Sequence, residues 1–356
     1  MKENFYAQAS PFYKELYRDV SKYIASKKVP HTGDRRLRSK ANILFSTAVI
    51  LYLGIAAIGY FHLPIIFAFL LCLFLGINYS LIGFNVMHDG SHNSYSSDPK
   101  VNYRMSLSLN AMGADSFIWK EQHCILHHGF TNIPGHDNDI NQSPWMRLHP
   151  GERWRWFYRY QHIYGPLLLY AQEYWYWVFV SDFKTYFIGR IGAHKLKKRT
   201  KKDHYAFWGG KLFHLMTMFI MPIFVFHFSF VETLIGYLAM TFTCGFLISI
   251  VFQLAHLEES NRFYSQDEAK ETSWAECQVR TTSNFATKSK LLTWLLGGLN
   301  FQIEHHLLPQ ISHVWYPELA HIVEKKCLEY GWPYHKPPLP KAIRSHLRFL
   351  RQLGQN

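Results

Sequence analysis

Histidine is the residue whose number and spacing could support chemistry in this sequence. The chain of 356 residues contains 21 histidines, and four groups of them are spaced as metal ligands are. Residues four apart lie on one face of a helix, so a pair at that spacing can present two imidazoles to one point. The groups are His88-Asp89-Gly90-Ser91-His92, His123-Cys124-Ile125-Leu126-His127-His128, the single His256, and Gln302-Ile303-Glu304-His305-His306.

The number of these histidines predicts a site with two metal ions. Neutral imidazole is a ligand for iron, copper, zinc and nickel, and one ion accepts about four to six ligands. Histidine alone does not choose the metal, so a dinuclear iron site that activates dioxygen and a zinc site that activates water both stay open. The predicted ligands are His88, His92, His123, His127, His128, His256, His305 and His306.

Two long blocks without Lys or Arg must position these histidines. They are residues 41–99 and 212–261, and residues 41–88 also lack Asp and Glu. A helix needs about 20 apolar residues to cross a bilayer, so each block is long enough for two spans. We expect transmembrane helices at 42–61 and 65–87, joined by a turn at 62–64, and at 212–231 and 233–257, with a break near Glu232.

The distribution of charge predicts how these spans are oriented. The chain has 38 Lys+Arg against 25 Asp+Glu, a formal net charge of +13, and its cations lie outside the apolar blocks. The positive-inside rule then places all three basic segments in the cytoplasm. Because an even number of spans precedes every histidine group, all four groups can meet on that side. The orientation in the membrane accounts for the net positive charge of the chain, so no nucleic acid partner is expected.

These observations predict an all-α integral membrane protein. Its four transmembrane helices form two hairpins, and a cytosolic helical cap holds the histidine-rich dimetal site. The expected parts are a cytosolic amino-terminal segment (1–41), a first transmembrane hairpin (42–87), a cap with two histidine groups (88–211), a second hairpin (212–257) and a cap with the last group (258–356). The five cysteines form no CxxC pair, so no disulfide framework is expected.

An aromatic stretch at 154–177 lies between the two apolar blocks. Its Trp and Tyr residues alternate with arginines, a composition typical of the boundary between membrane and water. Gly165, Pro166 and Glu173 interrupt it, and a single additional span would invert the remaining topology. We therefore expect a helix lying at the interface and not a fifth span.

The sequence argues against a pair of haems bound within the bilayer. His214 and His227 lie at the two ends of the third predicted span, at a spacing similar to that of bis-histidine cytochromes. Such a site needs partner histidines inside another span, and residues 41–87 contain only His62, at a tip. We expect His214 and His227 to be packing or span-end residues.

The motifs HDGSH, HCILHH and QIEHH, in this order and between paired apolar hairpins, resemble the three histidine boxes of the integral-membrane fatty acid desaturases. The resemblance covers about residues 82–309. Gln302, at the start of the third box, and the segment 131–140 are similar to the front-end branch. Enzymes of that branch place a new double bond between an existing one and the carboxyl end of the acyl chain.

The chain departs from many front-end enzymes because it lacks a fused cytochrome b5 domain. Only about 41 residues precede the first predicted span, and the segment 149–152 is a solitary near-match to the HPGG haem motif. The resemblance therefore implies a separate redox donor, of ferredoxin or cytochrome b5 type with its reductase. It also makes a multi-pass protein of the bacterial inner membrane the expected location, with the active site on the cytoplasmic side.

The resemblance also implies cofactors and residue roles. The cofactors would be two iron ions, with dioxygen as co-substrate, and the substrate a long acyl chain taken from membrane lipid or acyl-CoA. The eight histidines would be the iron ligands, and Gln302 would lie at the metal edge as a weak ligand or hold a water. Asp89, Asp137 and Asp139 would orient imidazoles by accepting their second N–H. His136 is not included among the ligands.

Other functions are compatible with the same residues. A membrane hydroxylase or ketolase acting on a lipid or hydrocarbon would use the same di-iron site but end in oxygen insertion. A membrane zinc hydrolase would not need oxygen. A non-catalytic metal-binding or transport protein would need ionisable groups along its spans, and residues 41–87 have none.

Overall fold

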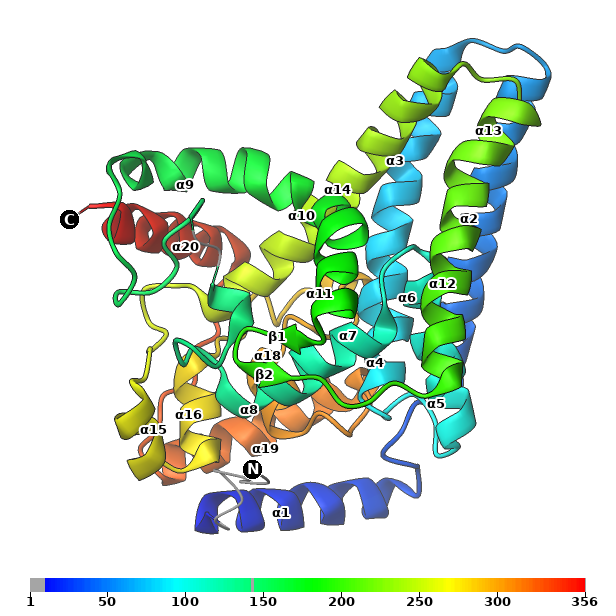
Figure 1. Ribbon diagram of the computed structural model, residues 1–356. Helices are drawn as coiled ribbons and strands as arrows, with labels where there is room; N and C mark the ends of the chain where they lie inside the picture. Colours follow the sequence, from blue (N-terminus) through cyan, green and yellow to red (C-terminus); the bar gives the residue numbers. More distant parts are fainter. Residues whose placement is uncertain (1–9, 142–143, 356) are drawn as a thin grey trace.

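The computed structural model describes residues 10–141 and 144–355, and it is almost entirely helical (Figure 1). Four long helices form a bundle at the upper right of the view, and shorter helices gather below and to the left as a cap. One short antiparallel pair, β1 (Arg190–Ile191) with β2 (His194–Lys195), is the only sheet in the described part of the chain. The predicted all-α membrane fold is confirmed. Residues 1–9 of the expected amino-terminal segment lie outside the described residues.

The first hairpin consists of α2 (Arg35–Tyr60) and α3 (Ile65–Ile82). α2 begins at Arg35 and not at 42, because the Asp34 side chain caps it by accepting a hydrogen bond from the Arg36 amide at 2.8 Å. α3 does not end with the apolar block. It continues through one π-helical turn, η1 (Gly83–Met87), into α4 (His88–Ser91), so the first histidine group stands at the end of a span.

The second hairpin differs from the expected one at its start and at its break. Its first helix consists of α12 (Lys201–Leu215), the π-helical turn η7 (Met216–Ile220) and α13 (Met221–Phe224), and its second is α14 (Phe230–His256). The break lies at 225–229 and not near Glu232. The reason is a capping box, in which the Ser229 amide donates to Glu232 Oε2 at 2.8 Å and the Glu232 amide donates to Ser229 Oγ at 3.2 Å.

The hairpins pack through small residues and present apolar side chains outward. The helices Arg35–Tyr60, Ile65–Ser91, Lys201–Phe224 and Phe230–His256 are long and apolar enough to cross a membrane. A Cβ atom on Gly76 of α3 would collide with the carbonyl oxygen of Met240 in α14, so these two helices touch backbone to backbone. Ile50 and Phe224 are examples of large apolar side chains that remain exposed on the outside of the bundle, as in a lipid-facing surface.

The aromatic stretch is helical and runs sideways from the bundle (Figure 1). It is a succession of short turns: η4 (Trp156–Tyr160), α9 (Gln161–Tyr164), η5 (Gly165–Leu169), α10 (Tyr170–Tyr176), η6 (Trp177–Ser181) and α11 (Asp182–Ile188). It is not one of the four helices apolar enough to span. α10 packs closely on α14, where a Cβ atom on Gly245 would collide with the carbonyl oxygen of Ala171.

The remaining helices build the cap and fix the last histidine group. Four helices of the cap share a core that includes Phe12, Val279, Ile303, Leu307 and Leu319, all fully buried. These helices are α1 (Pro11–Lys27), α16 (Trp274–Thr281), α18 (Gln302–Leu307) and α19 (Tyr316–Glu329). The other elements of the cap are α5 (Pro99–Ser106), α6 (Ser108–Ala111), α7 (Ser116–Trp119), η2 (Lys120–His127), α8 (His128–Phe130), η3 (Asn138–Ile140), α15 (Gln266–Glu271), α17 (Lys290–Leu295), η8 (His313–Trp315) and α20 (Leu339–Gly354).

Candidate metal centre

The structure brings all eight predicted ligand histidines into one buried cluster. They come from four segments: the end of the α3–α4 helix, the η2–α8 turn, the last residue of α14, and α18. Two of these segments contain π-helical turns, η1 and η2, a distortion that is frequent at functional sites. All eight side chains are at most 9% exposed. The histidines that the sequence grouped by spacing therefore lie together in the structure.

Two of the groups in this cluster that could hold a metal ion share no histidine, and further groups overlap them through His128 and Asp139. In the first group, nitrogen atoms of four histidines lie within 4.8 Å of one another, and in the second those of three histidines do. His128 lies between the groups, with its Nε2 atom 3.3 Å from His123 Nε2 and 2.9 Å from His305 Nε2. The first group is His88, His92, His123 and His305, and the second is His127, His256 and His306.

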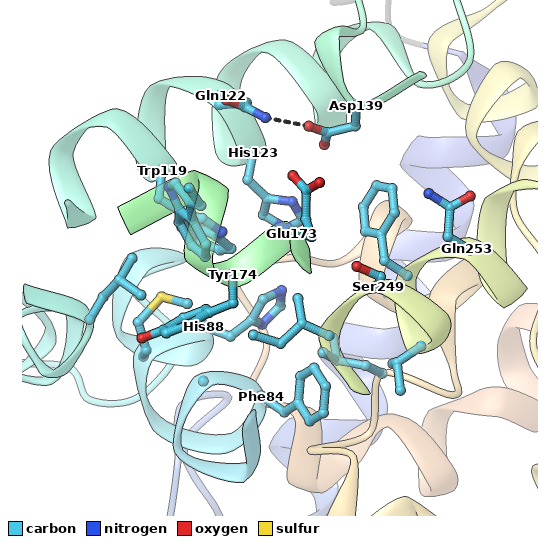
Figure 2. A pocket seen from close by; sticks show the side chains of 18 of the residues that line it. Phe84, His88, Trp119, Gln122, His123, Asp139, Glu173, Tyr174, Ser249 and Gln253 are labelled. Carbon is cyan, nitrogen blue, oxygen red and sulfur yellow. Dashed lines mark hydrogen bonds between the residues drawn. The ribbon is translucent and has the colours of Figure 1, made fainter. Parts of the chain in front are cut away.

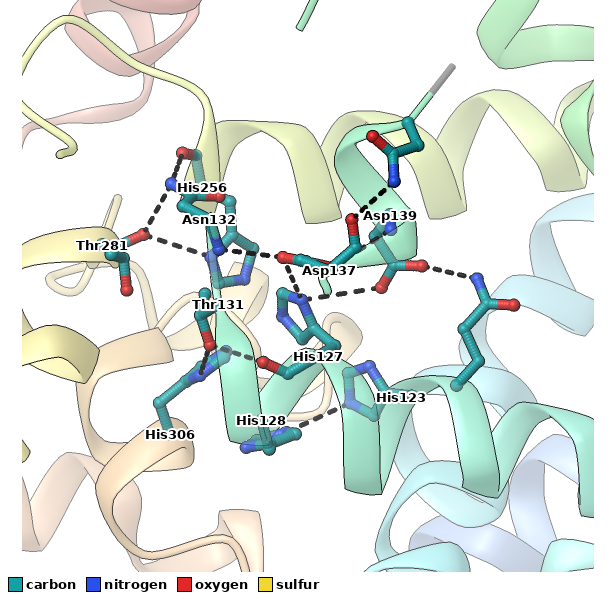
Figure 3. A network of polar contacts seen from close by, with 12 residues as sticks. His123, His127, His128, Thr131, Asn132, Asp137, Asp139, His256, Thr281 and His306 are labelled. Atoms are coloured by element: carbon teal, nitrogen blue, oxygen red, sulfur yellow. Dashed lines mark hydrogen bonds and ion pairs between the residues drawn. The ribbon is translucent and has the colours of Figure 1, made fainter. Parts of the chain in front are cut away.

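The second group has the hydrogen bonding of a metal site (Figure 3). His127 Nδ1 lies 3.1 Å from Asp137 Oδ2, His256 Nδ1 lies 3.3 Å from the Thr281 carbonyl oxygen, and His306 Nδ1 lies 2.7 Å from Gln278 Oε1. Each of these oxygens can only accept, so each Nδ1 carries the proton and donates it. Each Nε2 is then left with a lone pair, and all three Nε2 atoms are buried without a protein partner. This residue set fits a metal ion.

The first group is less fully supported by hydrogen bonds. His305 Nδ1 lies 3.2 Å from the Tyr316 hydroxyl, whereas both ring nitrogens of His88 are buried without a hydrogen-bond partner. Trp119 stacks on His123 with ring centroids 4.4 Å apart and contacts His88 edge to face. The tryptophan therefore holds the ring plane of a ligand by packing.

Burial keeps most of these imidazoles neutral, which is the form that binds metal ions. Desolvation, assisted by repulsion from neighbouring histidines, lowers the pKa of several imidazoles well below the usual value. These are His123, His128, His305 and His306. His127 is the exception, because the charges of Asp137 and Asp139 outweigh burial and raise its pKa.

The three predicted orienting carboxylates have different surroundings. Asp137 accepts from His127 and also from the Asn132 amide at 2.9 Å. Asp139 Oδ2 lies 3.6 Å from His127 Nδ1, and its other oxygen accepts from the Gln122 amide at 2.5 Å. Asp89 lies 4.0 Å from His88 Nδ1, beyond hydrogen-bond range.

Asp89 contacts His313, a histidine that belongs to none of the four groups spaced as metal ligands. Its Oδ1 atom lies 3.0 Å from His313 Nδ1, and its Oδ2 atom accepts from the Ser312 hydroxyl at 2.7 Å. His313 Nε2 in turn lies 3.3 Å from Lys40 Nζ in α2. Asp89 therefore ties the first histidine group to η8 and to the first span.

Comparisons with known proteins agree with this geometry. The family model described as Fatty acid desaturase matches residues 63–338. The chain belongs to the fatty acid desaturase family. The sn-1 linoleoyl-lipid 6-desaturase of Synechocystis sp. is 34% identical over 98% of this chain and 97% of its own length. The enzyme of the same description from Arthrospira platensis is 35% identical over 91% and 87%. The acyl-lipid (8-3)-desaturase of Physcomitrium patens is 33% identical over 98% and 72%.

Family membership decides between the classes of function that the sequence left open. The desaturase is an oxidoreductase that acts on fatty acyl chains and is embedded in a membrane. The predicted enzyme class is thereby confirmed, and the hydrolase and metal-transport readings are not supported. The buried histidine groups could hold metal ions, and membership of this family is consistent with iron.

A cavity of the desaturase opens onto the first histidine group (Figure 2). His88, His123 and Gln302 line it, and the role of Gln302 at a metal edge stays a prediction. Most of the remaining wall is apolar and includes Phe84, Met87, Leu109, Met112, Trp177, Phe252 and Leu299. A mostly apolar cavity beside buried imidazoles suits an acyl chain better than a polar substrate.

Two carboxylates and an amide form one polar part of the cavity wall. Gln122, Asp139 and Glu173 lie together at one end, beside His123 (Figure 2). Burial raises the pKa of Glu173 to about 7, and the charge of Asp139 adds to this effect. Burial and the neighbouring Asp137 raise the pKa of Asp139 to about 6. Glu173 and Gln122 have no spacing pattern that would have predicted them.

The histidines that were set aside lie outside the metal groups. His214 is buried and its Nε2 atom lies 2.9 Å from the Tyr237 hydroxyl, which is a packing contact between two spans. His227 stacks against His62 at the tips of the hairpins, with ring centroids 6.3 Å apart. His136 stacks on Phe130 and is not part of either histidine group.

Proposed function

We propose that the chain is a front-end acyl-lipid desaturase, which introduces a cis double bond between an existing double bond and the carboxyl end of an acyl chain. The observation that carries this proposal is the apolar cavity with His88, His123 and Gln302 in its wall. Relatives that are 34% and 35% identical over nearly the whole chain are sn-1 linoleoyl-lipid 6-desaturases. By that similarity, the substrate is a linoleoyl chain on a membrane glycerolipid, and the new bond is at carbon 6.

The eight histidines are proposed as ligands of two iron ions. Neutral imidazoles with lone pairs on Nε2 suit iron, and eight exceed what one ion holds. When bound, iron supplies the dioxygen chemistry that removes two hydrogens from unactivated methylenes; dioxygen and two electrons are consumed with two protons, and two waters are formed. Asp137 and Asp139 fix the tautomer of His127, and Asp89 supports the helix end that carries His88. Gln302 stays a weak-ligand or water-holding candidate.

The cavity is proposed to position the acyl chain. A chain lying along Met87, Met112 and Trp177 passes His88 and His123 at short range, and the apolar wall excludes bulk water from the reacting carbons. The polar end at Gln122 and Glu173 suits the ester group of the substrate, since an ester needs hydrogen-bond donors when it leaves water. In a front-end enzyme the ester lies only a few carbons from the reacting methylenes, which agrees with a polar end beside His123.

The membrane orientation and the electron supply are also proposals. Four crossings place the tips of both hairpins outside and the cap in the cytoplasm, by the positive-inside rule. The host membrane is proposed to be the bacterial inner membrane. A separate ferredoxin or a cytochrome b5 with its reductase delivers the electrons to the cap.

The test is expression in a bacterial host fed linoleate, with a redox donor co-expressed, followed by mass spectrometric location of double bonds in the extracted lipids. We expect a new bond at carbon 6 in glycerolipid-bound chains, and none with His305→Ala, which should accumulate to the wild-type level. A new bond on the methyl side of the existing ones would overturn the front-end assignment. A hydroxylated chain would replace desaturation by hydroxylation.

A further inference from the structure

The last helix of the chain, α20, carries an unusual distribution of charge. Its sequence, LPKAIRSHLRFLRQLG, has four cations and no carboxylate. The cations are Lys341, Arg344, Arg348 and Arg351, all exposed, and within the described residues none of them forms an ion pair. The opposite face of the helix is buried through Ala342, His346, Phe349, Leu350 and Leu353. The arginines follow at spacings of four and three, so they form one stripe along the helix.

Hydrogen bonds hold the helix α20 against the aromatic segment. The Gln161 amide donates to the Leu350 carbonyl at 2.8 Å, the Arg147 guanidinium donates to the Leu353 carbonyl at 3.0 Å, and the Trp154 indole donates to the Gly354 carbonyl at 2.9 Å. The last carbonyls of α20, which no helix can satisfy internally, are thus bound by residues in and just before the aromatic segment. α20 lies directly below α9 in Figure 1.

An open groove runs along the stripe. His162 of α9 forms one side, and α20 supplies the rest: Leu339, Pro340, Ile343 and Leu347 give an apolar floor, and Arg344, Arg348 and Arg351 give cationic edges. An apolar floor with a cationic rim matches a molecule that has hydrocarbon and negative charge side by side. A soluble anion would need no apolar floor.

The neighbouring surface has the composition of a membrane interface. On the aromatic segment, Trp156, Tyr160, Ile163, Leu167 and Leu168 are each more than half exposed. Exposed Trp and Tyr beside exposed aliphatic side chains are typical of a helix that lies at the level of lipid headgroups. Because α20 is hydrogen-bonded to this segment, a segment lying at the headgroups would bring the arginines of α20 near the phosphate groups of lipids.

We propose that this groove, lined by His162, Arg344, Arg348 and Arg351, binds the phosphate headgroup of an anionic phospholipid. Guanidinium groups bind phosphate oxygens in pairs of parallel hydrogen bonds, so three arginines on one stripe suit a phosphodiester better than scattered lysines do. The acyl chains of the lipid lie against the apolar floor and continue over the exposed aliphatic side chains. The groove is separate from the metal centre, and the inference does not depend on the proposed reaction.

The test uses the whole chain, purified in detergent and exchanged into nanodiscs of equal parts phosphatidylglycerol and phosphatidylcholine with identical acyl chains. After release into the gas phase, native mass spectrometry counts the lipids retained. We expect retention of one phosphatidylglycerol in preference to phosphatidylcholine. The triple variant Arg344→Gln, Arg348→Gln, Arg351→Gln should lose this preference about tenfold or more, because each cation near a lipid surface contributes to binding.

The matched control removes three exposed cations elsewhere. Lys198→Gln, Lys201→Gln, Lys202→Gln changes the net charge equally and should keep the preference for phosphatidylglycerol. Equal retention of both lipids by the wild type, or an equal loss in both triple variants, would overturn the proposal. Displacement of the bound lipid by millimolar inorganic phosphate alone would also overturn it, because a free anion would then be the ligand. Thermal unfolding of both variants in detergent shows that they are folded.

Discussion

At the scale of single residues, the desaturase fixes three imidazoles of the histidine cluster through hydrogen bonds of their Nδ1 atoms. His127 donates to Asp137, His306 to Gln278 and His256 to the Thr281 carbonyl, so three rings are fixed in orientation and tautomer before any metal binds. Outer hydrogen bonds of this kind usually influence metal affinity nearly as strongly as the ligands. The buried Asp137 carboxylate is the most completely bonded of them, since it also accepts from the Asn132 amide.

Asp137→Asn should therefore lower iron affinity or turnover by about 10- to 100-fold while the protein stays folded. The amide keeps the size of the carboxylate, but it offers one acceptor oxygen in place of two and loses the negative charge that favours His127 Nδ1–H. Iron content after equilibration with limiting iron, and turnover at saturating substrate, are the measurements. Asp267→Asn changes an exposed carboxylate in α15 and serves as the control. Unchanged iron affinity and turnover in Asp137→Asn would contradict the orienting role.

Glu173 gives a prediction about pH. Burial, and then the charge of Asp139, raises its pKa from 4.5 to about 7, so the folded protein holds a proton that the unfolded chain releases. The contribution of Glu173 to stability is therefore greatest below pH 4.5 and falls as the pH rises toward 7. The thermal midpoint of the wild type, relative to Glu173→Gln, should fall by several degrees between about pH 5 and pH 8. A parallel pH dependence of the two proteins would contradict the raised pKa. Glu271→Gln, at the exposed end of α15, should follow the wild type.

The residues that sequence reasoning found are those with a spacing rule. The histidine pairs four apart were predicted in this way, whereas the orienting roles of Asp137 and Asp139 came from the family resemblance. Gln278, Tyr316, Trp119 and Glu173 reach the site only through tertiary packing, and no local pattern marks them. Asp89 was expected to orient a ligand imidazole, but it bonds to His313 because η8 folds back against the end of α4.

At the scale of elements, π-helical turns and close helix contacts position the ligands. η1 and η2 each carry or precede a histidine box, and their wider turn places His123 and His128, five residues apart, with Nε2 atoms 3.3 Å from each other. The sequence predicts helices here but not their π-helical form, because that form depends on what the rings meet. The second hairpin shows the same limit: its apolar block was predicted, but its ends are set by the capping boxes at Thr200 and Ser229.

The close contact between α3 and α14 predicts that Gly76 cannot be replaced without loss of stability. Gly76→Ala would push a methyl group into the Met240 carbonyl, and should lower stability by about 1–3 kcal/mol, the usual result of overpacking. Because α3 carries the first histidine group and α14 ends at His256, iron retention should fall with stability. Thermal unfolding in detergent and iron content are the measurements.

Gly209→Ala is the matched control for this substitution. Gly209 lies exposed in α12 with no atom near the position of a Cβ, so alanine should be neutral or slightly stabilising. An unfolding midpoint in Gly76→Ala as high as in Gly209→Ala would show that the two spans are not in backbone contact.

At the scale of the whole molecule, the distribution of cations predicts the orientation. The tips of both hairpins lack Lys and Arg, and every basic segment belongs to the cap or to its junction with the spans. Leu63→Cys, at an exposed tip, should react with a membrane-impermeant maleimide in intact cells. Lys198→Cys, in the cap, should react only after permeabilisation. The unmodified chain gives the background from its five cysteines, and labelling of Lys198→Cys in intact cells would reverse the proposed orientation.

The central claim is that four segments far apart in the sequence build two adjacent metal sites. The most direct measurement is the iron content of anaerobically purified protein, taken together with turnover. We predict two irons per chain in the active wild type, and about one iron with loss of turnover in His306→Ala, which removes a proposed ligand of the second group. Full turnover with one iron per chain, or with iron absent and another metal present, would contradict the account.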